Sequence, residues 1–253
     1  MKIFVIPDCQ IRPGDDTKFL RNIGRYIAEK EPDVIVNIGD FADMPSLSSY
    51  DIGKKAYEGR RYRDDVHAVQ SAMFELCDPI RDKRHRQFLN KKKLYTPRMI
   101  MTLGNHENRI NRAINNDPKL EGTISIDDLN YEHFGWDVYK FLDVVVVEGV
   151  AFSHYFSTGV AGRPASTAAA QLNKKHQSCI SGHQQGLMIA HANRADGKRI
   201  TSVIAGSCYE HNEEYLGPQG NKHWRGCLML HNVNEGEFDL ATLPLSYFED
   251  RYK

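Results

Sequence analysis

Five residues that can bind metal ions each follow a short apolar run of the chain. Carboxylate, amide oxygen and imidazole are the donors that hard or borderline divalent cations take in proteins. In open α/β sheets, ligands bind at the carboxyl ends of the strands, so we expect the five side chains to converge on one crevice. The residues are Asp8, Asp40, Asn105, His154 and His183, after the apolar runs 2–7, 34–38, 98–103, 150–153 and 178–181.

The apolar runs are interpreted as strands of an α/β fold. The run 2–7 predicts a buried first strand, and a helix follows in which Phe19, Ile23 and Ile27 share one face. A second strand is expected at 34–38, which gives a parallel β-α-β unit. Further strands are expected at 98–103, 143–147, 150–154, 178–182, 226–233 and 237–243, with a hairpin of 186–193 and 199–206, a polar helix after 98–103 and a helix at 164–176.

The segment 44–97 has a different character. Apolar residues at helical spacing begin at Val66, and Asp78-Pro79 is expected to open a second helix. Seven Lys and Arg residues lie within 81–93. We expect a helical, basic insertion beside the site; the basic run is either a solvated helix face or a wall that steers phosphate. The arginines and tyrosines of 57–63 carry the same ambiguity.

Composition limits the class of protein. A chain of 253 residues is long enough for one large domain, so 1–253 is expected to be a single unit. Lys plus Arg and Asp plus Glu both number 33, which argues against indiscriminate coating of nucleic acid. No apolar run reaches the length of a membrane span, and the first residues do not resemble a secretory signal. Five cysteines without a CxxC pair predict free thiols and a cytoplasmic protein.

Five ordered motifs give the chain a resemblance to the calcineurin-like metallophosphoesterases. They are Asp8-x-Gln10, Gly39-Asp40-x-x-Asp43, Gly104-Asn105-His106-Glu107, His154 and Gly182-His183, which resemble the family patterns DxH, GDxxD, GNHE, a lone His at a strand end and GHxH. The resemblance implies a fold of two stacked mixed β-sheets flanked by helices. It also implies hydrolysis of a phosphoester by a hydroxide that bridges two divalent ions.

The same resemblance implies a role for each motif residue. Asp40 would bridge both ions, while Asn105, His154 and His183 would complete the shell of the second. Asp8 and position 10 would hold the first ion. His106 would stabilise or protonate the leaving oxygen, and Asp43 would orient the His106 ring.

The chain departs from the family on one side of the site. Gln10 and Gln185 stand where the histidines of DxH and GHxH belong. Exchange of nitrogen for oxygen donors favours Mn²⁺ or Mg²⁺ over Zn²⁺ and predicts a weaker first site. Two divalent ions are expected, Mn²⁺ first, with Mg²⁺, Fe or Zn²⁺ as alternatives. His191 is a further candidate that would compensate for Gln185, whereas His211 and His223 are expected to be surface or structural.

Candidate substrate contacts are Arg163 in a glycine-bearing loop, Arg109 after the GNHE motif, and Asn105. The basic segment favours a phosphodiesterase or nuclease that acts on a nucleotide or nucleic acid. A phosphomonoesterase is the alternative, and Met44 stands where the protein phosphatases of this family have an arginine. A non-catalytic binding module is the third reading, against which His106 and Asp43 argue. The sequence leaves the oligomeric state open.

Overall fold

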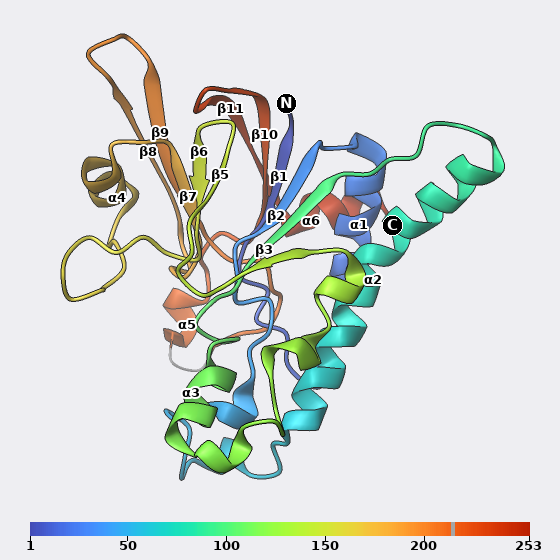
Figure 1. The fold of residues 1–253 in the computed structure, drawn as a ribbon, viewed down its shortest axis with the longest axis vertical. Coiled ribbons are helices and arrows are strands. Elements are labelled where there is room, and N and C mark those ends of the chain that lie inside the picture. Colours follow the sequence, from blue (N-terminus) through green and yellow to red (C-terminus); the bar gives the residue numbers. More distant parts are fainter. Residues whose placement is uncertain (214–215) are drawn as a thin grey trace.

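The structure is a computed structural model that describes residues 1–213 and 216–253. Two β-sheets stack on each other, and helices cover their outer faces (Figure 1). The expected fold class, two stacked mixed sheets flanked by helices, is confirmed.

The first sheet has the strand order β11-β10-β1-β2-β3-β4. Strands β1, β2, β3 and β4 are mutually parallel, and β10 joins β1 as an antiparallel neighbour. Because parallel strands end at the same edge of a sheet, the loops after β1, β2 and β3 meet there. The bounds are β1 Ile3–Ile6, β2 Val34–Asn37, β3 Arg98–Thr102, β4 Asp137–Tyr139, β10 Gly226–Asn234 and β11 Glu237–Pro244.

The second sheet has the order β5-β6-β7-β9-β8. Strand β7 is parallel to both β6 and β9, so the loops after β6 and β7 also leave from one edge. The hairpin expected from the sequence is β8 and β9. The bounds are β5 Val145–Val147, β6 Val150–Phe152, β7 Cys179–Ser181, β8 Leu187–Asn193 and β9 Arg199–Ala205.

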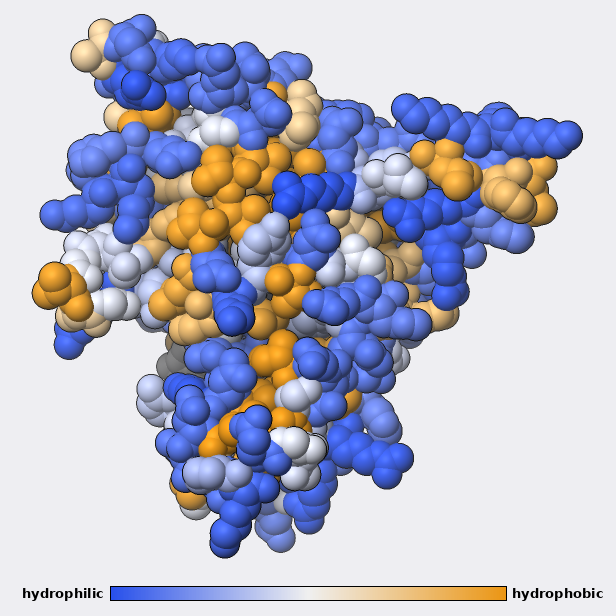
Figure 2. All heavy atoms as spheres, viewed as in Figure 1, coloured by the Kyte–Doolittle hydropathy of each residue, from blue (hydrophilic) through white to orange (hydrophobic). Residues whose placement is uncertain are grey.

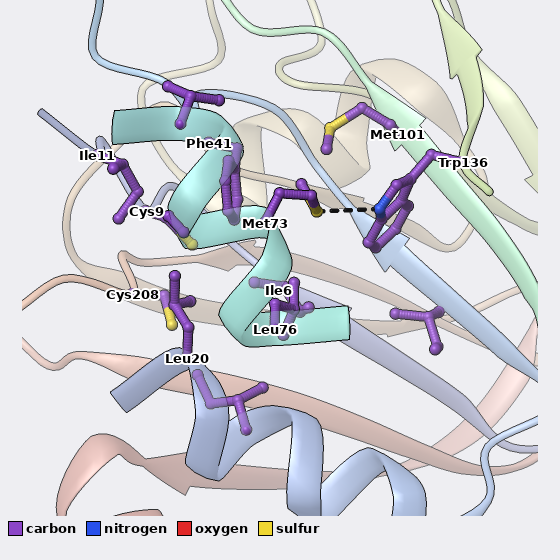
Figure 3. Packing of buried hydrophobic residues seen from close by; sticks show 14 of the residues in the cluster. Ile6, Cys9, Ile11, Leu20, Phe41, Met73, Leu76, Met101, Trp136 and Cys208 are labelled. Atoms are coloured by element: carbon purple, nitrogen blue, oxygen red, sulfur yellow. Dashed lines mark hydrogen bonds between the residues drawn. The ribbon is translucent and has the colours of Figure 1, made fainter. Parts of the chain in front are cut away.

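Alternate residues of the first sheet serve two separate cores. Ile3 and Val5 of β1 pack in the cluster between the sheets, whereas Phe4 and Ile6 pack toward the helices. Figure 3 shows the helix-side core, where the Trp136 indole N–H points at the Met73 sulfur, 3.1 Å away. This period of two fixes the register of the strands and therefore the loops at their ends.

Helices α1 (Lys18–Lys30), α2 (Tyr62–Leu89) and α6 (Leu245–Arg251) cover the first sheet, and α4 (Ala168–Lys175) covers β8 and β9 of the second (Figure 1). The remaining helices are α3 (Arg109–Asn116) and α5 (Gly217–Gly220). Short 3₁₀ turns lie at Pro45–Leu47, Lys55–Tyr57, Pro118–Leu120, Ile126–Leu129 and Glu132–Phe134.

The expectation for 44–97 was wrong in two respects. One helix, α2, replaces the two helices expected, and Pro79 lies inside it. Its close packing on α1, where Gly24 lies against Leu76 and Pro79, compensates for the backbone hydrogen bond that proline cannot make. The helix also runs from the site edge, where the Ser46 N–H bonds Asp65, to the amino ends of β2 and β3. The basic part of the segment therefore lies away from the site.

Two expectations about the chain at large can be compared with the structure. All five cysteines are free thiols, including Cys208 and Cys227, whose sulfur atoms are 3.6 Å apart. No helix within 1–213 and 216–253 combines the length and apolar character needed to cross a bilayer. The surface in Figure 2 is mostly hydrophilic, with apolar side chains gathered over the middle of the face and on the projecting end of α2.

Candidate metal centre

Two glycines let the loops at the strand ends approach each other. A Cβ atom on Gly104 would lie 2.0 Å from the Asp40 carboxylate, and one on Gly182 would lie 2.1 Å from the Asp8 carboxylate. Asp40 and His183 themselves adopt left-handed backbone angles (φ 49° and 67°). Such angles cost free energy in residues other than glycine and often occur at functional sites.

Four of the predicted ligands have their donor atoms in one small volume. Asn105 Oδ1 is 2.9 Å from His154 Nε2 and 2.7 Å from His183 Nδ1. His154 Nε2 is 3.3 Å from Asp40 Oδ2. Neighbouring ligands of one ion with bonds of about 2.1 Å are separated by roughly 3 Å, so this spacing suits a single divalent cation. Asp40, His154 and His183 thus form a candidate metal site.

The tautomer of His154 places a lone pair among the other electron-pair donors of this cluster. Its Nδ1 lies 2.9 Å from the Ile38 carbonyl oxygen, which only an N–H can satisfy. In the neutral ring, Nε2 therefore presents a lone pair to Asn105 Oδ1 and to the Asp40 carboxylate. Lone pairs converging in a buried place require a cation, either a proton on His154 or a metal ion.

The pKa values of the ligands follow from this crowding. Although burial disfavours the imidazolium, Asp40 and Asp8 raise the pKa of His154 to about 9. Burial and the charge on His154 lower the pKa of His183 to about 4, so His183 is neutral and ready to bind an ion. Burial raises the pKa of Asp8 to about 8, against the attraction of His154. A metal ion would displace the protons that His154 and Asp8 hold at neutral pH.

Asp8 and Gln10 lie beside the loops that carry His183 and Asp40. The Asp8 carboxylate accepts the His183 N–H at 3.0 Å, and its side chain is fully buried. Gln10 is also buried, and its N–H donates to the Asp40 carbonyl at 2.8 Å. Asp8 is therefore next to the loop that carries His183, and Gln10 is next to the loop that carries Asp40.

Gln185 is held by a residue that the motifs do not include. Its side-chain oxygen accepts a 2.7 Å hydrogen bond from the Tyr209 hydroxyl. Tyr209 is stacked on His211 at 4.3 Å, and the Arg225 guanidinium lies 4.8 Å from the centre of the Tyr209 ring. The stacking restricts the tyrosine, so the position of Gln185 is defined by the segment after β9.

The interpretation of His191 as a replacement for Gln185 was wrong. His191 lies on β8, where its ring bonds the Thr201 hydroxyl of β9 at 3.0 Å. Four residues of extended chain, about 13 Å, separate it from Leu187, the first residue of β8 after the bend that carries Gln185.

His106 and Asp43 form the expected pair. The ring nitrogen Nδ1 of His106 is 2.6 Å from Asp43 Oδ1, while its Nε2 faces Asp40 Oδ2 at 3.7 Å. Burial opposes a charge on His106, but Asp40 and Asp43 raise its pKa. The imidazole thus has one nitrogen fixed by a carboxylate and the other directed toward the metal cluster, as a proton donor to substrate needs.

Arg109 contacts the same pair. Its Nη1 donates to the carbonyl oxygen of Asp43 at 2.7 Å and to Asp43 Oδ1 at 3.1 Å. Its Nη2 is 3.4 Å from His106 Nε2. The guanidinium therefore lies where a phosphoryl oxygen near His106 would meet it. Arg163, in contrast, is exposed in the loop 157–164, and within the described residues no contact joins it to the ligands.

Glu107 has a structural role that the motif alone did not indicate. Its fully buried carboxylate accepts the backbone N–H groups of Asp40, Ala42 and Gly104 at 2.9–3.0 Å, and the Tyr131 hydroxyl at 3.2 Å. It therefore fixes the two loops that carry Asp40 and Asn105. The buried acceptor needed by these N–H groups explains a charged residue in this position.

A ring of four ionic side chains was also missed. Arg12 contacts Asp15 and Glu213, and His211 lies between the same two carboxylates at 3.3 and 2.8 Å. Arg12 Nη1 is 4.0 Å from Asp43 Oδ2, so the ring adjoins the His106–Asp43 pair. No sequence spacing could reveal it, because about 200 residues separate Arg12 from Glu213.

The fold and the site together carry the features of one known protein family. Metal-capable residues end five strands of a two-sheet sandwich and lie beside a histidine–carboxylate pair. A model of the family described as calcineurin-like phosphoesterase matches residues 1–185 of the 253. The chain belongs to this family.

Individual relatives match over shorter stretches or at low identity. The Gene 54 protein of Mycobacterium phage L5 is 38% identical over 74 residues, and that of Mycobacterium phage D29 is 39% identical over 70. These stretches span 29% and 28% of the chain and 29% and 27% of the two phage proteins. A conserved uncharacterized protein of Streptococcus pneumoniae, described as a predicted phosphoesterase, has 9% identity and a TM-score of 0.40, with 97% of this chain and 90% of that chain covered.

Proposed function

We propose that the protein is a dinuclear phosphodiesterase that hydrolyses a phosphodiester of a nucleotide or nucleic acid. The observation that carries the proposal is the convergence of Asp40, Asn105, His154 and His183 beside His106. Bound divalent ions would lower the pKa of a water molecule and neutralise the phosphoryl oxygens.

Each neighbouring residue has a part in this proposal. Asp40, Asn105, His154 and His183 would hold the second ion, with Asp40 shared between both ions. Asp8, Gln10 and Gln185 would hold the first ion through oxygen atoms, which suits Mn²⁺ better than Zn²⁺ and gives a weaker site. Asn105 would also contact the substrate. The cytoplasm is the proposed compartment.

His106 would give a proton to the leaving oxygen, and Asp43 would keep its ring in place. His106→Ala is expected to retain Mn²⁺ binding and to lose about 10²- to 10⁴-fold in kcat. Equal kcat in the variant and the natural chain would remove His106 from the reaction. No hydrolysis by the natural chain with Mn²⁺ present would instead favour the third alternative, a binding module.

The preference for a diester rests on the arginine nearest to His106. Arg109 donates through Nη1 to Asp43 and to the Met44 carbonyl, and its Nη2 lies 3.4 Å from His106 Nε2, where it would meet a phosphoryl oxygen beside that ring. Arg12 is engaged by carboxylates. One guanidinium nitrogen directed at the substrate suits the monoanion of a diester better than the dianion of a monoester. Arg163 would contact substrate farther from the metals, from its exposed loop.

The experiment compares two chromogenic esters with Mn²⁺ present. We expect kcat/KM for bis-p-nitrophenyl phosphate to exceed that for p-nitrophenyl phosphate, and short single-stranded DNA or RNA to be cleaved. If both bis-p-nitrophenyl phosphate and the nucleic acids survive, the diesterase assignment fails.

One observation favours a phosphomonoesterase as the second candidate. Arg109 brings a guanidinium to the His106–Asp43 pair from a position different from that of the protein phosphatases, in which an arginine replaces Met44. It would grip a terminal phosphoryl group there. A higher kcat/KM for p-nitrophenyl phosphate than for the bis ester would support this candidate over the first.

A further inference from the structure

The far end of α2 carries a surface that the metal site does not explain. A cavity of about 480 Å³ lies between α2, the start of β3 and the turn Glu132–Phe134. We call it the α2 recess; its lining includes Phe74, Arg81, Arg84, Met99, His133 and Phe134. Met99 is the second residue of β3, so the recess opens at the amino ends of the strands, opposite the site.

Aromatic and basic side chains alternate along the helix from this recess outward. Phe74, Arg81 and Phe88 recur every seven residues, close to two helical turns, and therefore share one face of α2. The Arg81 guanidinium lies 4.9 Å from the centre of the Phe74 ring. Phe74 is 41% exposed and Phe88 is 69% exposed. Two large apolar side chains exposed on one helix face are candidate contacts for a binding partner.

The end of α2 beyond the recess projects from the body of the molecule (Figure 1). We call this end the α2 tip; it consists of Phe88, Leu89, Lys91, Lys92, Lys93 and Leu94. Leu89 is 64% exposed and Leu94 is 40% exposed. Figure 2 shows apolar side chains among hydrophilic ones on this projection.

The cations of this region divide into two groups. Arg81 pairs with Asp78, and Lys83 pairs with Glu31, so both are neutralised locally. Arg86 and Lys91–Lys93 have no ion pair within the described part of the chain, and Arg84 bonds only a carbonyl oxygen, that of Tyr95. Unpaired positive charge thus lies beside exposed aromatic rings.

We propose that the α2 recess and the α2 tip bind single-stranded nucleic acid. Unstacked bases can pack on Phe74, Phe88 and the rings that line the recess, while the free cations meet the phosphates. The bases of a duplex are paired and stacked inside the helix, so none is available to enter the α2 recess. A bilayer is planar and cannot fill one. The surface lies apart from the metal site, so the proposal does not depend on which ester that site hydrolyses.

Binding is tested by fluorescence anisotropy with a labelled oligothymidine of about 20 nucleotides and the matching duplex. The full chain is used, with EDTA to prevent cleavage. Phe88→Ala should weaken binding of the single strand about tenfold, because each stacked base contributes strongly to affinity. The substitution is safe for folding since the ring is largely exposed.

Charge is tested by changing Lys91, Lys92 and Lys93 together to Gln. The slope of log K against log salt should become about 2 units shallower for the single strand. The matched control changes Lys119, Lys140 and Lys174 to Gln, which removes equal charge from exposed positions elsewhere. This control should keep the slope, and all variants should hydrolyse bis-p-nitrophenyl phosphate at the natural rate.

Several results would overturn the assignment. They are no binding of the single strand, tighter binding of the duplex, or an affinity that neither Phe88→Ala nor the tip variant changes. An equal loss in the control triple would also overturn it, since the effect would then be one of net charge. Tip-dependent binding of anionic vesicles or an acidic peptide, without the oligonucleotide, would assign the surface to those partners instead.

Discussion

Substitution of Glu107 by Gln tests whether this buried carboxylate fixes the metal loops. Both oxygens of Glu107 accept two donors each. Oε2 accepts the N–H groups of Asp40 and Gly104, and Oε1 accepts the Ala42 N–H and the Tyr131 hydroxyl. A glutamine has one oxygen, so its NH₂ group must face one of these donor pairs.

The expected loss of stability follows from the more favourable of the two orientations of the glutamine amide. With NH₂ toward Tyr131, the hydroxyl can turn and accept, and the Ala42 N–H alone loses its acceptor. An orphaned buried donor costs about 1–3 kcal/mol. The remaining bonds also lose their charge assistance. Burial and the nearby Asp40 carboxylate raise the pKa of Glu107, which shows that its charge is disfavoured. Removal of this charge therefore offsets part of the loss of stability. We expect a net loss of about 2 kcal/mol.

Urea unfolding of the metal-free chain, followed by circular dichroism, measures the free energy of unfolding. A loss of about 2 kcal/mol corresponds to a Tm lower by roughly 4–8 °C for a chain of this size. Glu121→Gln is the matched control, because Glu121 is exposed and its change should stay within about 0.5 kcal/mol. A Glu107→Gln loss as small as that of the control would show that the four hydrogen bonds do not stabilise the loops.

Two further predictions concern metal binding. In the metal-free protein the pKa of His154 is raised to about 9 by Asp40, after the opposing effect of burial. This group therefore stabilises the metal-free fold fully below its unfolded pKa of about 6.5, and the contribution is lost as pH rises through 9. Mn²⁺ binding near pH 7 should release the proton of His154, and the affinity for Mn²⁺ should rise up to pH 9. Calorimetry in two buffers of different ionisation enthalpy measures this release. Binding without proton release would contradict the raised pKa of His154. Tyr209→Phe should lower the affinity for the Mn²⁺ ion near Gln185 about 10- to 100-fold. The control is Tyr95→Phe, which loses a similar hydroxyl hydrogen bond far from the site. Equal Mn²⁺ affinities of the two variants would exclude this role of Tyr209.

The sequence predicts the fold well where the hydrophobic pattern is decisive. Buried apolar runs predicted β1, β2, β3, β6 and β7, the strands that lead to the metal-capable residues. Position after a strand end and motif spacing are local properties, so a sequence contains them directly. Three-residue β4 was missed because its residues are largely accessible and its run is too short for a period to appear.

Features that depend on distant contacts were beyond the sequence. Pro79 predicted a helix start, but packing of α2 on α1 outweighs that local preference. The Tyr209–Gln185 bond and the ring that includes Arg12 and Glu213 join segments whose proximity only the fold determines. The position of the basic segment is of the same kind, since it follows from the direction of α2 and not from its composition.

The central claim is that Asp40, Asn105, His154 and His183 bind a divalent ion beside His106. Anomalous scattering from crystals soaked in Mn²⁺ tests it most directly. We predict a peak bonded to Asp40 Oδ2, Asn105 Oδ1, His154 Nε2 and His183 Nδ1, and a second, weaker peak near Asp8. A well-ordered crystal without a peak among those four atoms would contradict the assignment.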